Sequence, residues 1–311
     1  MNSDSVPKGG RYSFHNAVLS LIRLLFTAPC LWLFLNTSGA QAQVNLDGRI
    51  PETLVSETLS LFALNIAHAR GSSLNQLLVT REGHQHSLAA IATVLGTSNI
   101  DIVALQEVDA PSWWSGDFDH LQHLAELSDY PASVHGTHAE SWFFSYGTAL
   151  LSRVRMQNTL SHSFKPSWPT ATKGYVRGAV LWQSAGTAPQ MLTVISVHLD
   201  FSRKSVRKAQ LAELLADLAT LPRPLIVVGD FNADWAEPES PVRELVERAG
   251  LQAYRPSAQH LGTYKDTERL DWILISGDLS FRDYRVVPDI VSDHLATVAT
   301  IEFKKNRDAE P

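Results

Sequence analysis

Leu225-Ile226-Val227-Val228-Gly229-Asp230-Phe231-Asn232 is the stretch from which the fold of this chain can be worked out. Its first four residues are a continuous β-branched and leucine run, which predicts a strand buried on both faces. Gly229 ends the run, and rigid backbone then presents a carboxylate, Asp230, and an amide, Asn232. Asp230 can take a proton or face a metal ion, and Asn232 can donate a hydrogen bond. The same residue types also form ordinary turns, so this stretch alone leaves both interpretations open.

The whole chain has the composition of a globular protein. Its 311 residues are 44% hydrophobic and 19% charged, which excludes a disordered chain and leaves room for one large α/β domain or two small ones. The formal net charge of −6 gives no support for tight, sequence-independent binding to a polyanion. A nucleic-acid substrate is still allowed, because a bound divalent cation supplies positive charge locally.

The N-terminal residues 1–42 have the pattern of a secretory signal. A polar, basic start leads into the apolar run Leu24–Leu35 and then into small residues that end at Ala42. We expect cleavage after Ala42 and export to the periplasm or the medium, with a retained membrane anchor as the alternative. The single cysteine, Cys30, lies inside this segment. The remaining residues, 43–311, contain no repeat or linker, and we expect them to form one domain.

Polar side chains border six apolar runs of the chain. Each has an ordinary explanation by itself, as a turn cap, a solvated strand end or a hydrogen-bonded buried histidine. Six runs with the same feature instead predict one site built from several strand ends. The bordering residues are Asn65 at the end of 59–65, Glu107 at the end of 101–107, His198 and Asp200 around the end of 192–199, Asp230 and Asn232 after 225–229, Asp271 near the start of 269–275, and Asp293 and His294 before 295–303.

Helical patterns alternate with these strands. Apolar residues at helical spacing, caps and glycine or proline stops predict the helices. Two further strands are predicted from apolar runs at 147–152 and 175–182. The predicted helices span 86–96, 119–127, 205–219 and 240–250.

Two loops carry aromatic or basic residues next to predicted site residues. Trp113 and Trp114 follow Glu107 closely and either cover an edge of the core or form a wall for an apolar group of a substrate. His68 and Arg70 follow the first strand and either face a substrate or are solvated loop residues.

Seven motifs, taken in order, resemble the endonuclease/exonuclease/phosphatase superfamily, which includes the DNase I-like nucleases, apurinic-site endonucleases, neutral sphingomyelinases and inositol polyphosphate 5-phosphatases. The resemblance spans 59–303 and implies a four-layer αββα sandwich of two mixed sheets. It also implies a Mg²⁺-dependent phosphoester hydrolase site at one edge. The motifs are Leu64-Asn65-Ile66, Leu105-Gln106-Glu107-Val108, 147–153, His198-Leu199-Asp200, Gly229-Asp230-Phe231-Asn232, Arg269-Leu270-Asp271 and Ser292-Asp293-His294.

This resemblance also implies a set of metal ligands. Glu107 is the principal ligand in this assignment, with Asn65 and Asp293 near the same ion. Carboxylate and amide oxygens suit Mg²⁺, with Mn²⁺ as the alternative. Arg177 is assigned as a further contact to the substrate phosphate.

The catalytic roles follow from the same resemblance. Asp230 orients or deprotonates the attacking water, while Asn232 and His198 bind the phosphate. Asp271 holds His294 in one tautomer, and the second ring nitrogen of His294 serves the phosphate or the water.

The expected activity is hydrolysis of a phosphodiester, in nucleic acid or in a phospholipid head group. The alternatives are a phosphomonoesterase acting on a small phosphorylated or inositol-like molecule, and a binding protein without turnover. Ala67 stands where the apurinic-site endonucleases have an acid, which weighs against a DNA-repair role. We expect a monomer with no obligate protein partner.

Overall fold

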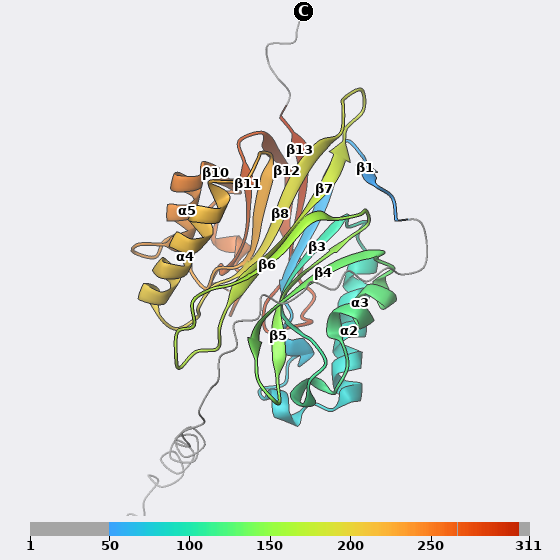
Figure 1. Cartoon of the computed structure of the whole chain (residues 1–311), viewed down its shortest axis with the longest axis vertical. Helices are drawn as coiled ribbons and strands as arrows, with labels where there is room; N and C mark the ends of the chain where they lie inside the picture. Colours follow the sequence, from blue (N-terminus) through green and yellow to red (C-terminus); the bar gives the residue numbers. More distant parts are fainter. Residues whose placement is uncertain (1–49, 266, 305–311) are drawn as a thin grey trace, which may run out of the picture. The chain divides into compact units, whose positions relative to one another are not determined.

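The computed structural model describes residues 50–265 and 267–304, in which two β-sheets pack face to face (Figure 1). The predicted signal segment, 1–42, lies outside the described residues. Within the described part of the chain, no helix has the length and apolar character that crossing a membrane requires.

The first sheet has seven strands. It holds β9, the strand predicted from the Leu225 run, between a parallel and an antiparallel neighbour. The strand order is β1 (Thr53–Val55), β7 (Gly174–Gln183), β8 (Gln190–His198), β9 (Leu225–Asp230), β11 (Asp271–Ser276) and β10 (Leu251–Ala253), with β6 (Gln157–Ser163) also paired to β7.

The second sheet has six strands and is also mixed. Its central pair, β2 and β3, is parallel, and the other pairs are antiparallel. The order is β12 (Leu279–Val286), β13 (Thr297–Phe303), β2 (Leu59–Asn65), β3 (Ile102–Asp109), β5 (Ser145–Ser152) and β4 (Ala132–Glu140).

Helices cover the outer face of each sheet. One apolar core lies between the sheets, a second lies under α2 (Arg81–Gly96) and α3 (His120–Ser128), and a third lies under α4 (Lys204–Leu218) and α5 (Pro241–Ala249). Figure 1 shows the two helix pairs on opposite sides of the sheets. The predicted four-layer αββα sandwich is therefore confirmed.

Element boundaries follow local capping. α5 begins at Pro241 because the Ser240 hydroxyl accepts from the backbone N–H of Arg243, and it ends at Gly250 in the left-handed region, as predicted. α2 instead begins at Arg81, five residues before the prediction, because Thr80 accepts from the N–H of Gly83. Four short 3-10 turns lie in the described loops, at Ala67–Ala69, Gln76–Leu78, Trp113–Ser115 and Gln259–Leu261.

The predicted polar strand ends meet at one edge of the sandwich. In the first sheet, the end of β8 lies beside the end of β9, and the start of β11 lies opposite it. Three hydrogen bonds join the sheets here: Asn65 Nδ2 donates to Asp230 Oδ2 (3.0 Å), Gln106 Nε2 donates to Ser196 Oγ (3.0 Å), and Ser196 Oγ donates to the Leu105 carbonyl (2.9 Å). Side chains from both sheets therefore contribute to a single site.

Candidate active site

Asp230 lies at the centre of the site. Its carboxylate accepts from the Asn65 amide (3.0 Å), from the Asn232 backbone N–H (2.8 Å) and from the Asn232 side chain (3.2 Å). His198 Nε2 lies 3.4 Å from Asp230 Oδ2. With Asp271 directly across the strand pair, four of the predicted residues are in place around the Asp230 carboxylate.

The backbone before Asp230 requires glycine. Gly229 has φ +142°, and a Cβ there would lie 2.1 Å from the carbonyl oxygen of Val197 on β8. Any other side chain would push β8 and β9 apart. Gly229 therefore holds His198 and Asp230 side by side at the strand ends.

The pKa of Asp230 is raised to about 7. Burial is the largest cause, and the charge of Asp271 adds to it, although His294 and the hydrogen bond from Asn65 act in the opposite direction. A carboxyl group with this pKa can accept a proton from water at neutral pH and release it again.

Asp271 and His294 form the predicted pair. His294 Nδ1 lies 2.8 Å from Asp271 Oδ2, which also accepts from the Thr263 hydroxyl at 2.7 Å. Burial lowers the pKa of His294, but the charge and hydrogen bond of Asp271 outweigh it and raise the pKa to about 10. At neutral pH His294 is therefore a cation, suited to bind a phosphate oxygen.

A β-bulge directs Glu107 into the site. The register between β3 and β5 shifts between Gln106 and Val108, and Glu107 has φ +54°. Burial would raise the pKa of Glu107, but the charges of Lys173 and His68 outweigh it and hold the pKa well below its usual range. Glu107 is thus an anion at every working pH.

Lys173 is a member of the site that the sequence interpretation missed. Its Nζ lies 3.2 Å from Glu107 Oε1 and 3.4 Å from His198 Nδ1, and the residue is only 5% exposed. An ammonium group can only donate hydrogen bonds. Nδ1 of His198 is therefore the acceptor, and Nε2 carries the ring proton. Burial, followed by the charge of Lys173, lowers the pKa of His198 well below its usual value, which keeps this ring neutral. Neutral His198 can then donate from Nε2 to a substrate oxygen.

Replacing Lys173 by methionine should destabilise the metal-free protein, because Glu107 would lose its closest cation. Loss of one partner of a buried pair costs up to about 3 kcal/mol when the other is partly exposed. We expect a lower melting temperature in chelator, and a smaller deficit once Mg²⁺ is added. Lys208→Met, at an exposed position on α4, is the matched control. An unchanged melting temperature would show that Lys173 does not neutralise Glu107.

Two predicted residues lie away from their expected partners. Arg177, predicted to contact the substrate phosphate, instead pairs through Nη1 with Asp217 of α4 at 3.1 Å, on the face of the first sheet that α4 covers. Asp293 is hydrogen-bonded by Arg70 and is a third exposed. The family resemblance predicts that Asp293 lies near the ion bound by Glu107. In this structure its carboxylate instead accepts a hydrogen bond from Arg70.

Asn232 also differs from its predicted role. Its amide nitrogen donates to the carbonyl of Leu199 (3.0 Å) and to Asp230. In this structure the side chain therefore positions Asp230, and one of these bonds must open before Asn232 can donate to a phosphate.

The comparison with protein families gives a clear result. Residues 64–294 match the model of the Endonuclease/Exonuclease/phosphatase family, which is more than half of the chain. The chain belongs to this family. The family resemblance predicted from the motifs is therefore confirmed. A search of curated proteins found no match.

Solved structures agree on the fold of this family member. An endonuclease/exonuclease/phosphatase from Beutenbergia cavernae is 18% identical, with a TM-score of 0.60 over 80% of this chain and 72% of that chain. The human Nocturnin catalytic domain with bound sulfate is 20% identical, with a TM-score of 0.60 over 85% and 98%. A mannosyl-6-phosphatase from Bacteroides thetaiotaomicron is 14% identical, with a TM-score of 0.57 over 79% and 100%. At these identities the likeness establishes the shared fold alone.

Members of this family generally hydrolyse phosphoesters with divalent metals, and the residues present here fit such an ion. Carboxylate oxygens of Asp230 and Asp271 lie within 4.8 Å of each other. Asp271 Oδ1 is buried and has no hydrogen-bond partner among the described residues. Burial, with the charge of Asp271 added to it, raises the pKa of Asp230, so a cation bound here would favour the charged form of this carboxylate. A bound cation would compensate the negative charge of these buried carboxylates. The Glu107 carboxylate is a further metal ligand beside them.

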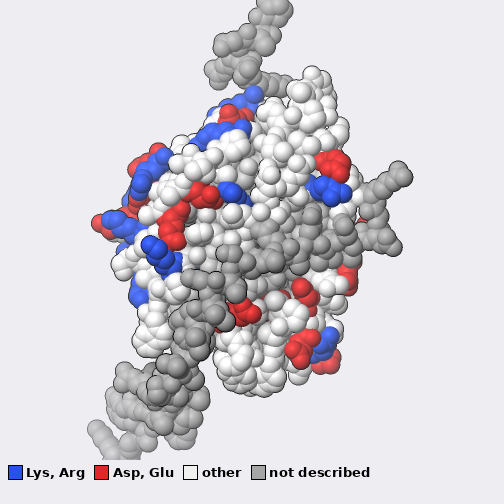
Figure 2. Space-filling view, viewed as in Figure 1, with Lys and Arg blue, Asp and Glu red and all other residues white. Residues whose placement is uncertain are grey.

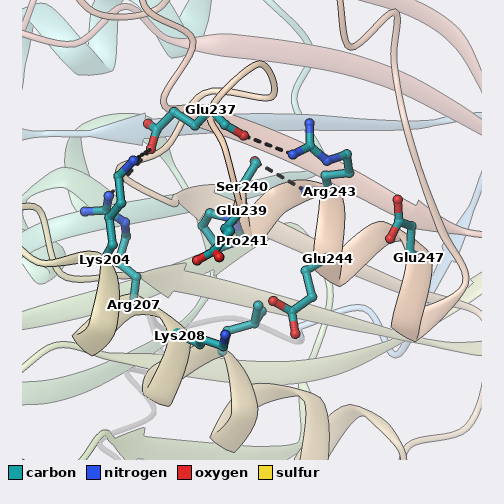
Figure 3. Close-up of a pocket in the computed structure, with 11 residues that line it drawn as sticks. Lys204, Arg207, Lys208, Glu237, Glu239, Ser240, Pro241, Arg243, Glu244 and Glu247 are labelled. Atoms are coloured by element: carbon teal, nitrogen blue, oxygen red, sulfur yellow. Dashed lines mark hydrogen bonds and ion pairs between the residues drawn. The ribbon is translucent and has the colours of Figure 1, made fainter.

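A surface groove of about 240 Å³ lies apart from this cluster, between α4 and α5 (Figure 3). Its charged lining is balanced: Lys204 and Arg207 lie 3.8 and 3.7 Å from the carboxylate of Glu237, and Arg243 donates to the Glu237 carbonyl. Three of the four cations that line the groove are thus directed at protein oxygens. We therefore assign the chemistry to the strand-end cluster.

Proposed function

We propose that this protein is a Mg²⁺- or Mn²⁺-dependent phosphodiesterase that cleaves by in-line attack of water. The observation that carries the proposal is the convergence of Asp230, His198 and the Asp271–His294 pair on one carboxylate-centred site, with Glu107 beside it. A family member that keeps all of these groups has the parts for turnover, which argues against a binding protein on the same fold.

Each group has a defined task in the proposed reaction. Asp230 accepts the proton of the attacking water, as its pKa of about 7 allows. Neutral His198 and cationic His294 donate to the phosphoryl oxygens as charge grows on them, and the ester P–O bond opposite the water breaks, its leaving oxygen taking a proton from solvent. Lys173 adds a nearby positive charge. A divalent ion, when bound, would neutralise further negative charge on the phosphate.

The test is hydrolysis by the purified protein of plasmid DNA, phosphatidylcholine vesicles, bis(p-nitrophenyl) phosphate and a phosphomonoester. Each substrate is offered with Mg²⁺, with Mn²⁺ and with chelator. We expect metal-dependent cleavage of a diester and little cleavage of the monoester. Preferred cleavage of the monoester would replace the proposal with a phosphomonoesterase, the activity named for the Bacteroides neighbour. Binding of the metal without any cleavage would leave the binding-protein alternative.

Among diesters, we propose a phospholipid head group as the substrate. Exposed large apolar side chains gather on the loops at the edge that carries the site, and in the described residues only Val55 and Leu127 of this kind lie elsewhere. Tryptophan and aliphatic side chains on separate loops suit a lipid surface. Figure 2 shows basic side chains interspersed with acidic ones over α4 and α5, which does not suit a polyanion. The exposed apolar side chains at this edge are Leu74, Leu77, Leu78, Trp113, Trp142, Trp168, Phe201 and Ile290.

Removing two of these tryptophans should separate lipid from soluble substrates. We expect Trp113→Ser combined with Trp142→Ser to lower hydrolysis of vesicle phospholipid about tenfold or more, since each indole loses its burial in the lipid interface. Hydrolysis of bis(p-nitrophenyl) phosphate should stay within about twofold. Val55→Ser with Leu127→Ser is the control pair, exposed but away from the site. Equal losses on both substrates would count against the lipid surface.

The proposal also includes the setting in which the protein works. The basic start and apolar run of residues 1–42 support export, with release after Ala42. A monomer meets a lipid surface with one complete site, so no protein partner is required.

A further inference from the structure

His68 lies between two carboxylates. Its Nδ1 is 2.8 Å from Asp109 Oδ2, and its Nε2 is 3.4 Å from Glu107 Oε2. Trp114 and Tyr146 enclose the ring at centroid distances of 4.9 and 4.5 Å. The imidazole is therefore fixed in orientation, with one nitrogen held by protein and the other directed at Glu107.

Asp109 is built to hold this ring. It is fully buried, and its other oxygen accepts from the indole N–H of Trp114 at 2.6 Å. A carboxylate that takes the Nδ1 proton of a histidine leaves the lone pair on Nε2 and makes it more basic. This is the usual arrangement behind a metal-ligating histidine.

The separation of His68 Nε2 and Glu107 Oε2 suits a shared ion. Two neighbouring ligands at about 2.1 Å from an octahedral ion are about 3 Å apart. The observed 3.4 Å is close to this value and long for a strong charged hydrogen bond. Glu107 is also the most open of these groups, with a fifth of its side chain exposed.

We propose that His68 Nε2 and Glu107 Oε2 bind the same divalent ion, with Asp109 positioning the imidazole. This extends the proposed function, on which it rests for the presence of a metal. A nitrogen donor beside a carboxylate favours first-row transition metals over Mg²⁺. The site therefore takes Mn²⁺ more tightly than an all-oxygen site would.

The test measures metal binding and needs no substrate, so its failure is separate from failure of the proposed hydrolysis. The chelator-stripped protein is titrated with Mn²⁺, followed by electron paramagnetic resonance, and the pulsed spectrum is recorded for nitrogen coupling. We expect one tight Mn²⁺ with histidine nitrogen coupling in the unaltered protein. His68→Gln should lose that coupling and bind Mn²⁺ at least about tenfold more weakly, with a smaller change for Mg²⁺.

Two variants complete the design. Asp109→Asn keeps the ligand but loses its orienting charge, so we expect weaker binding with the coupling retained. His86→Gln, exposed on α2, should match the unaltered protein. An unaltered protein without nitrogen coupling overturns the proposal, whether or not the variants fold. Unchanged Mn²⁺ affinity and coupling in folded His68→Gln also overturns it and leaves His68 as an ion-pair partner of Glu107.

Discussion

Replacing Asp230 by asparagine is expected to lower kcat by about a thousandfold or more. Asparagine keeps the shape and two of the surrounding hydrogen bonds but cannot accept a proton from water, and loss of a general base typically costs two to four orders of magnitude. The measurement is the metal-saturated rate on bis(p-nitrophenyl) phosphate. Asp283→Asn, exposed on β12, is the control. A variant that retained a tenth of the activity would show that another group takes the proton.

The same substitution should stabilise the metal-free protein at neutral pH. Burial raises the pKa of Asp230 from 3.8 to about 7 in the folded state. The folded protein therefore holds this proton more tightly than the unfolded chain does. The stability from this group is fully present below about pH 4 and is lost as the pH rises through about 7. Asparagine avoids the loss, so the melting temperature of the unaltered protein should fall relative to Asp230→Asn across this range.

Replacing Glu107 by glutamine should give the second large effect. The carboxylate is always ionised in the site, because the charges of Lys173 and His68 lower its pKa. Glutamine removes the charge without changing the size, so we expect metal affinity and the rate at fixed Mg²⁺ to fall at least about a hundredfold. The check is the Mg²⁺ dependence of the rate together with the melting temperature at rising Mg²⁺.

Glu140→Gln is the control for this substitution, because Glu140 is exposed at the end of β4. It should behave as the unaltered protein does. If Glu107→Gln kept its Mg²⁺ response, the ion would be held by the carboxylates of Asp230 and Asp271 instead.

Buried strands were predictable, and edge strands were not. β9 has four consecutive apolar residues because both of its faces are covered. β4, β6 and β12 lie at the borders of their sheets, and polar residues interrupt their apolar ones, so no apolar run indicates them. The sequence therefore predicted the centre of each sheet and missed its borders.

The alternation of side chains along β7 explains why Arg177 lies away from the site. Tyr175 and Arg177 share the face of β7 that packs under α4, where both contact Asp217. Lys173 precedes the strand, at the edge where the site lies. A polar residue bordering an apolar run was the signal used for the other positions. Applied to the start of β7, that signal would have found Lys173.

Other features depend on contacts between distant parts of the chain. The bulge at Glu107 reverses the alternation of β3, so that Gln106 faces the other sheet while Val108 packs in the core under the helices. No local residue pattern indicates it. Arg70 reaches Asp293 across 223 positions of sequence. The composition of the site could thus be predicted, and the pairing within it required the structure.

The hydrogen bonds that cross between the sheets have a consequence for folding. Asn65 belongs to the first half of the chain and Asp230 to the second, and they meet only when the two sheets close on each other. A fragment that forms one sheet alone therefore lacks a complete site. During synthesis, the site is complete only after the C-terminal strands have emerged and joined both sheets. With the export that we propose, the proposed activity would begin only after the chain had finished folding.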